Sequence, residues 1–254
     1  MMRICLTTLL LVALTVGAAV PADAETGSGT VYDPYAGLNA TGGAGRTVTR
    51  DRSRPPTGNL VVFLGDSLTR GPGIQLSQTY PALIQEHMDK LGLPFQIVNA
   101  GVNGNTSANA LARADKALEG PVAVLVVALG TNDANAVKAG ERDRKTTEIC
   151  RKLADNLDAI LAKARDRRIA LVLVPIKLPA FYGTKMVEGF ASVFQALAEK
   201  YRLHLPPGLL DGVWSQKKLW LANGHPNAAG HELMARNVWR VLGPTVKRRV
   251  PRSP

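Results

Sequence analysis

Residues 59–71 read NLVVFLGDSLTRG, a continuous apolar run that stops at a glycine and is followed at once by polar residues. A short apolar run without alternation is typical of a strand buried on both faces of a parallel sheet. Three more such runs follow along the chain: FQIVNA at 95–100, VAVLVVALG at 122–130 and IALVLVPI at 169–176. Helical periodicity occupies other segments, at about 79–91, 107–118, 141–167, 186–201 and 228–242. Strand and helix patterns therefore alternate.

This alternation predicts an α/β domain in which helices cover both faces of a parallel sheet. A further short strand is expected near residues 203–205, and the domain is expected to span residues 59–246. In such sheets, ligands bind at the carboxyl ends of the strands. Polar residues that directly follow the strands are therefore candidate site residues.

The two ends of the chain have a different character from the body. Residues 1–24 contain Arg3, an apolar run and the Ala22-Asp23-Ala24 sequence, which is the order of a secretory signal peptide. An uncleaved anchor helix is the alternative, but the run is shorter than the roughly 20 apolar residues that span a bilayer comfortably. Residues 25–58 are rich in Gly, Thr, Pro and Arg and are expected to form a flexible leader, and residues 247–254 form a basic tail. We therefore expect a periplasmic or secreted protein.

Composition excludes several classes of function. Two cysteines and four histidines make a metal-built site improbable, and removal of the signal would leave Cys150 without a partner for an intrachain disulfide. The formal net charge is +11. A basic body with a basic tail suits an anionic envelope surface. Nucleic-acid binding is not expected, because no basic recognition helix is visible and the signal directs the chain out of the cytoplasm.

Four residues are candidates for a catalytic or ligand-binding role because of their positions after the predicted strands or before the last helix. Ser67 follows the first strand, where its hydroxyl can face a ligand, although a serine there can also simply cap a helix. Gly104, after the second strand, can bring a backbone N–H close to a substrate oxygen, or can be an ordinary turn glycine. Asn132, after the third strand, offers an uncharged side-chain donor, or stabilises its own loop. His225, before the last helix, can act as the general base that a serine hydroxyl requires, or can be structural.

The remaining histidines are weaker candidates. His231 lies within the predicted last helix, and His87 and His204 have no polar neighbours in the sequence.

Four short motifs occur in this order along the chain: Gly65-Asp66-Ser67-Leu68, Asn99-Ala100-Gly101 through Gly104, Gly130-Thr131-Asn132-Asp133 and His225-Pro226-Asn227. Together they resemble the motifs of the SGNH hydrolases, also called the GDSL esterase and lipase family. The resemblance covers about residues 59–242 and is closest to the bacterial secreted arylesterase, thioesterase and lysophospholipase type. It implies a flavodoxin-like three-layer α/β/α sandwich with a five-stranded parallel sheet and no cofactor or metal. It also implies that Ser67 is the nucleophile and His225 the base, with the Ser67 N–H, the Gly104 N–H and the Asn132 side chain as oxyanion donors.

One position departs from the family pattern. The family usually has an aspartate three residues before the histidine, and here that residue is Ala222. In the Ser-His-Asp template, replacing the acid by its amide lowers the rate about 10⁴-fold. The ring of His225 is therefore expected to be oriented by a backbone carbonyl, by Asn223 or by Asp211. A second departure, Asn105 in place of the family aspartate, is expected to change a loop hydrogen bond.

These observations predict an exported serine ester hydrolase acting through an acyl-enzyme on short acyl esters, lysophospholipids or O-acetylated sugars. The loop Phe181-Tyr182-Gly183 is expected to line the acyl pocket. The alternative is a catalytically degraded protein of the same fold that binds envelope polysaccharide, which the missing acid favours.

Overall fold

The computed structural model describes residues 59–250 of the 254-residue chain. The predicted signal peptide, the predicted leader and residues 251–254 lie outside the described residues.

Four parallel strands form the sheet, in the order β2-β1-β3-β4. Their bounds are β1 Leu60–Gly65, β2 Gln96–Gly101, β3 Val122–Ala128 and β4 Ala170–Leu173. Gly65 at the end of β1 pairs in register with Gly101 of β2 and with Ala128 of β3. The carboxyl ends of these three strands therefore lie at one level, and the loops that follow them begin side by side.

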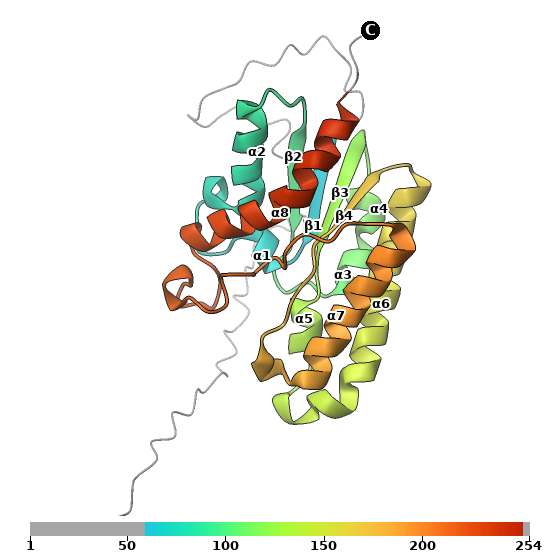
Figure 1. Ribbon diagram of the computed structural model, residues 1–254, viewed down its shortest axis with the longest axis vertical. Helices are drawn as coiled ribbons and strands as arrows, with labels where there is room; N and C mark the ends of the chain where they lie inside the picture. Colours follow the sequence, from blue (N-terminus) through green and yellow to red (C-terminus); the bar gives the residue numbers. More distant parts are fainter. Residues whose placement is uncertain (1–58, 251–254) are drawn as a thin grey trace, which may run out of the picture. The chain divides into compact units, whose positions relative to one another are not determined.

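Helices cover both faces of the sheet (Figure 1). One face carries α2 (Tyr80–Lys90) and α8 (Ala228–Arg249), and the other carries α3 (Ser107–Ala112), α4 (Ala114–Ala117), α6 (Arg142–Asp166) and α7 (Thr184–Tyr201). Two short helices, α1 (Ser67–Arg70) and α5 (Thr131–Asn135), and four 3-10 turns, η2 (Leu76–Gln78), η3 (Ala139–Glu141), η4 (Ala180–Tyr182) and η5 (Lys217–Leu219), complete the described elements. The predicted α/β fold is confirmed.

The core lies on both sides of β1. Val61, Val62, Phe63 and Leu64 are all 0% exposed, so successive side chains are buried on opposite faces of the sheet. Burying each large apolar side chain stabilises the fold by about 1.5–3 kcal/mol. The continuous apolar run of the sequence is thus the direct consequence of a strand with helices on either side.

The fifth predicted strand does not form, so the expectation of a five-stranded sheet is wrong: the described residues contain four strands. Residues 203–205 are not in a strand, and Pro206 and Pro207 follow them. Proline has no N–H to donate to a strand ladder. Beyond the end of β4, the Leu209 N–H donates to the Pro175 carbonyl at 3.0 Å, but residues 203–209 form no ladder with β4.

The last helix is longer than the sequence predicts, because it continues past Gly243 and Pro244 to Arg249. Pro244 is exposed, and the Thr245 hydroxyl donates to the Val241 carbonyl at 2.8 Å. Val246, which is 0% exposed, anchors the extension in the core. Part of the predicted basic tail, Lys247 to Arg249, is therefore helical. Between residues 59 and 250, no helix combines the length and the apolar character that crossing a bilayer requires.

Gly101 allows a close approach of β2 to α1. A Cβ added there would lie 2.5 Å from the Arg70 nitrogen and 2.9 Å from the Asp66 carbonyl oxygen. Because backbone atoms cannot easily move away, we expect Gly101→Ala to lower the free energy of unfolding by about 1–3 kcal/mol, measured by urea denaturation. Gly140→Ala is the matched control, since a Cβ there meets nothing within 4 Å. Equal stabilities of the two variants would contradict this packing argument.

Candidate active site

Ser67 lies in a tight turn between β1 and α1. Asp66 is the N-cap of α1, and its Oδ1 accepts the Leu68 N–H at 2.9 Å. Gly71, with a φ of 79°, ends the helix after one turn, and its N–H donates to the Ser67 carbonyl. The Ser67 N–H itself has no hydrogen-bond partner within residues 59–250. It is therefore available to a ligand at a helix N-terminus.

The side-chain amide of Asn132 joins the loops that follow three strands. Its Nδ2 donates to the Asn105 carbonyl at 2.9 Å and to Asp66 Oδ2 at 3.3 Å. Asn105 directly follows Gly104, and Asp66 directly precedes Ser67. The Asn132 amide, one predicted oxyanion donor, is therefore bonded to the chain neighbours of the other two, Gly104 and Ser67, and both of its hydrogens are used in these bonds.

Gly104 has a φ of 72°, and no protein atom lies within 4 Å of the place that a Cβ would occupy. The glycine is thus required by its left-handed backbone and not by crowding. Among the described residues the Gly104 N–H has no hydrogen-bond partner. It can therefore donate to a substrate oxygen.

Two side chains that the sequence did not single out as site residues hold the Gly104 loop. Asp133 accepts the Ser107 N–H at 2.9 Å and the Ser107 hydroxyl at 2.5 Å. Arg113 donates to Asn105 Oδ1 at 2.8 Å and to the carbonyls of Ala100 and Gly65 at 2.8 and 2.9 Å. Asn105, at the departure from the family pattern, thus accepts a hydrogen bond from a guanidinium.

His225 lies on a narrow hairpin. The Leu221 N–H donates to the His225 carbonyl at 2.8 Å, the Gly224 N–H donates to the Leu221 carbonyl at 3.1 Å, and Trp220 pairs with Pro226. A Cβ added to Gly73, in the loop after α1, would lie within 3 Å of side-chain atoms of Leu221 and Asn223. The hairpin therefore packs against the loop that follows Ser67.

Neither predicted side-chain partner reaches the His225 ring. The Asn223 side chain instead accepts the His225 backbone N–H at 3.1 Å. The Asp211 carboxylate is bonded by the Lys177 ammonium at 2.6 Å and by the Gly208 N–H at 2.9 Å. Among the described residues, His225 Nδ1 is buried without a hydrogen-bond partner, so a backbone carbonyl does not take this role either. No hydrogen bond joins the described Ser67 hydroxyl to the ring.

His231 is a buried neighbour of this site. It is 1% exposed, and its Nδ1 accepts the Tyr80 N–H at 3.1 Å, which places the proton of the neutral ring on Nε2. Burial, followed by the charge of nearby His225, lowers the pKa of His231 to about 4. Tyr80 also bonds through its hydroxyl to Thr69 Oγ1 at 2.9 Å, two residues from Ser67. The sequence indicated only that His231 lies in the last helix, and it did not predict the bond to Tyr80.

Asp66 is a buried carboxyl directly before Ser67 in the chain. It is 0% exposed, and burial, together with the charge of Asp133, raises its pKa to about 7, against the effect of the Leu68 N–H bond. Asp66, which accepts a hydrogen bond from the Asn132 amide, therefore changes its charge near neutral pH.

This raised pKa predicts a pH-dependent stability. Between about pH 4 and 7 the unfolded chain has lost this proton while the folded chain retains it, so folded stability decreases as pH rises. From pH 5 to pH 8 we expect a loss of about 2–3 kcal/mol from this group. Urea denaturation of the wild type and Asp66→Asn at both pH values measures it. A constant stability difference between the two proteins would show that Asp66 does not titrate in this range.

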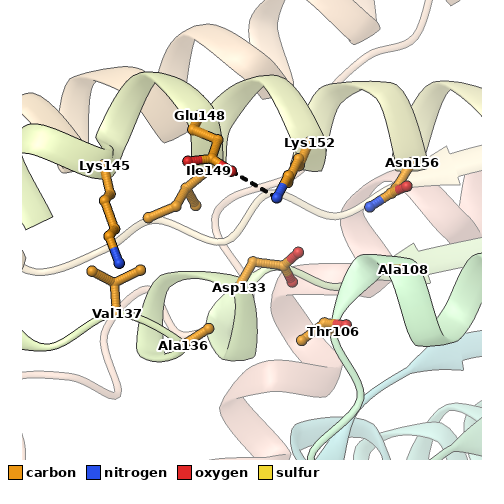
Figure 2. A pocket seen from close by; sticks show the side chains of 10 residues that line it. All are labelled: Thr106, Ala108, Asp133, Ala136, Val137, Lys145, Glu148, Ile149, Lys152 and Asn156. Atoms are coloured by element: carbon orange, nitrogen blue, oxygen red, sulfur yellow. Dashed lines mark ion pairs between the residues drawn. The ribbon is translucent and has the colours of Figure 1, made fainter.

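A separate groove of about 320 Å³ opens between α5, α6 and the start of α3 (Figure 2). Asp133 and Thr106, which follow Asn132 and Asn105 in the chain, form one wall, and Lys152 on the opposite wall pairs with Glu148 at 2.7 Å. None of the four predicted site residues lines this groove.

Comparison with known proteins agrees with this geometry. Residues 63–233 match the model of the GDSL-like Lipase/Acylhydrolase family. The chain is 33% identical to Esterase TesA of Pseudomonas aeruginosa over 72% of its own length and 88% of that protein. It is 30% identical to Thioesterase 1/protease 1/lysophospholipase L1 of Escherichia coli K12, over 76% of its own length and 88% of that protein.

A crystal structure of TesA has a TM-score of 0.65 to this structure, with 32% identity over 74% of this chain and 99% of that one. The chain therefore belongs to the GDSL-like lipase/acylhydrolase family, the SGNH hydrolases, and is an ester hydrolase of that type.

Proposed function

We propose that the protein is an exported serine hydrolase that cleaves short acyl esters, lysophospholipids or O-acetylated sugars through an acyl-enzyme. The observation that carries this proposal is the position of the Asn132 amide, 2.9 Å from the Asn105 carbonyl and 3.3 Å from Asp66. These two bonds tie the loops that carry Gly104 and Ser67 to Asn132, and the N–H groups of Ser67 and Gly104, which have no partner among the described residues, are donors of the kind that a tetrahedral oxyanion requires.

In the proposed mechanism, the Ser67 hydroxyl attacks the ester carbonyl while His225 removes its proton. The developing negative charge on the carbonyl oxygen is stabilised by the N–H groups of Ser67 and Gly104, and by the Asn132 amide once one of its hydrogens leaves Asp66 Oδ2, its acceptor at 3.3 Å. His225 then protonates the leaving alcohol, and water releases the acyl group by the same steps.

His225 works without the usual acid in this proposal. Its unpartnered Nδ1 and the residue Ala222 support a Ser-His dyad, in which the hairpin and the Asn223 bond to the His225 N–H hold the loop. A missing acid leaves both the tautomer and the charge of the ring unassisted, so a slow enzyme is expected. The same observation favours the second candidate function, a degraded binder of envelope polysaccharide.

The substrate classes are supported by the relatives and by the loop after β4. The relatives are named as an esterase and as a thioesterase and lysophospholipase. Phe181, in the loop that we expect to line the acyl pocket, is 68% exposed, and Tyr182 is buried beneath it at a ring distance of 4.8 Å. Export rests on the signal-like sequence of residues 1–24.

Ser67→Ala tests the nucleophile. We expect at least about a 10³-fold loss of p-nitrophenyl acetate hydrolysis, because no other group forms the acyl-enzyme. Ser192→Ala, which removes an exposed hydroxyl on α7, is the matched control and is expected to keep full activity. Equal rates for the wild type and Ser67→Ala would exclude this mechanism and leave the binding function.

Ala222→Asp tests the missing acid. Position 222 lies three residues before His225 in the hairpin turn, so a carboxylate there is expected to bond to Nδ1 and raise kcat about tenfold or more. Ala222→Asn has nearly the same shape without the charge and is expected to give a smaller gain. An unchanged kcat in Ala222→Asp would show that the acid is not what limits the rate.

A further inference from the structure

The edge of the sheet that carries the catalytic loops also carries exposed apolar side chains. The large hydrophobic side chains exposed among the described residues are Leu76, Leu91 and Phe181, at 66%, 47% and 68%. Leu76 lies in the connection after β1 and Phe181 in the connection after β4, so both belong to the carboxyl edge. Leu91 follows α2 at the opposite edge. Two of these three side chains are thus placed around the site.

A row of aromatic rings continues from Phe181 toward His225. The ring of Phe181 lies 6.1 Å from that of Trp214, and Trp214 lies 5.1 Å from Trp220. Trp220 pairs with Pro226, the residue after His225. The segment between α7 and α8 that carries these tryptophans crosses the sheet edge and reaches α1 (Figure 1).

The polar atoms of both indoles are already used. Trp214 donates to the Lys177 carbonyl at 3.1 Å, and Trp220 donates to the Val213 carbonyl at 3.0 Å. Both tryptophans are partly exposed, so they present apolar ring surface to solvent without a free donor. Apolar ring surface of this kind is what a lipid interface can bury.

Positive charge accompanies the aromatic row. Lys217 and Lys218 lie between the two tryptophans in the sequence, both are exposed, and neither pairs with an acidic side chain among the described residues. Asp211, the acidic residue nearest to them in the sequence, is already neutralised by Lys177. Exposed aromatic side chains beside unneutralised lysines have the chemistry of a membrane interface with anionic headgroups.

We propose that this surface, defined by Leu76, Phe181, Trp214, Trp220, Lys217 and Lys218, docks on an anionic phospholipid surface and presents membrane-borne acyl esters to Ser67. The proposal deepens the ester hydrolase function and rests on it. The rings and Leu76 would enter the headgroup region while the two lysines contact lipid phosphates. Lipid esters would then reach the catalytic edge without leaving the membrane surface.

Tryptophan quenching tests the docking directly. The full chain is mixed with brominated phosphatidylcholine vesicles, with and without phosphatidylglycerol, and tryptophan fluorescence is recorded. Residues 1–58 contain no tryptophan, so the signal reports on Trp214, Trp220 and Trp239 only. We expect quenching on anionic vesicles, much weaker quenching on neutral ones, and loss of most of the quenching in a Trp214→Phe/Trp220→Phe variant. No quenching, or quenching equal on both vesicles, would overturn the proposal.

Variants with matched controls separate the surface from the rest of the molecule. Lys217→Gln/Lys218→Gln is expected to weaken binding to anionic vesicles roughly tenfold or more and to leave hydrolysis of soluble p-nitrophenyl acetate unchanged. Phe181→Ser should also weaken vesicle binding, whereas Leu91→Ser and Lys90→Gln, at the opposite edge, should not. If the control variants lost as much vesicle binding as the surface variants, the assignment of the docking surface would be overturned.

Two further outcomes have distinct meanings. A dimer that forms without vesicles and is lost in the Phe181→Ser variant would assign the surface to a second copy of the chain and overturn lipid docking. Absence of soluble ester hydrolysis in the wild type would refute the proposed function, while the quenching result would still report on docking alone.

Discussion

Gly65, Gly101 and Ala128 end three parallel strands at one level, and the arrangement of the site depends on this register. Because the strands end together, the loops that leave them begin within hydrogen-bonding reach of one another. Asn132 bonds to residues on two of those loops, and Arg113 bonds to the ends of β1 and β2. A shift of one residue in any strand would separate the residues that we propose as oxyanion donors.

Buried ionisable groups support this arrangement and give it a dependence on pH. Asp66 keeps its proton in the folded state up to about pH 7, so its contribution to stability decreases as pH rises from about 4. His231 has the opposite effect: its pKa of about 4 lies below that of an unfolded histidine, so stability decreases as pH falls from about 6.5 toward 4. Between about pH 4 and 6.5, the contributions of Asp66 and His231 to folded stability therefore change in opposite directions with pH.

The same edge combines a catalytic and a surface role in our proposals. His225 stands on a hairpin that is closed by the single bridge between Trp220 and Pro226, and Trp220 belongs to the aromatic row that reaches Phe181. The hairpin that positions the base is therefore also part of the exposed apolar surface. This shared support explains why the tryptophans are fixed by backbone hydrogen bonds through both indole N–H groups.

The sequence by itself determined the order of the four strands and the main helices, and it placed three candidate site residues on the loops that follow the first three strands. A strand that is buried on both faces of the sheet requires a continuous apolar run in the sequence. Ser67, Gly104 and Asn132 lie shortly after such runs. The same reasoning overestimated the sheet at residues 203–205, where Pro206 and Pro207 prevent a ladder. Only the tertiary structure decided that Asp211 is held by Lys177 and does not reach the His225 ring, and that His231 accepts the Tyr80 N–H, 151 residues away. Such pairings depend on how distant segments pack, and local pattern carries no information about them.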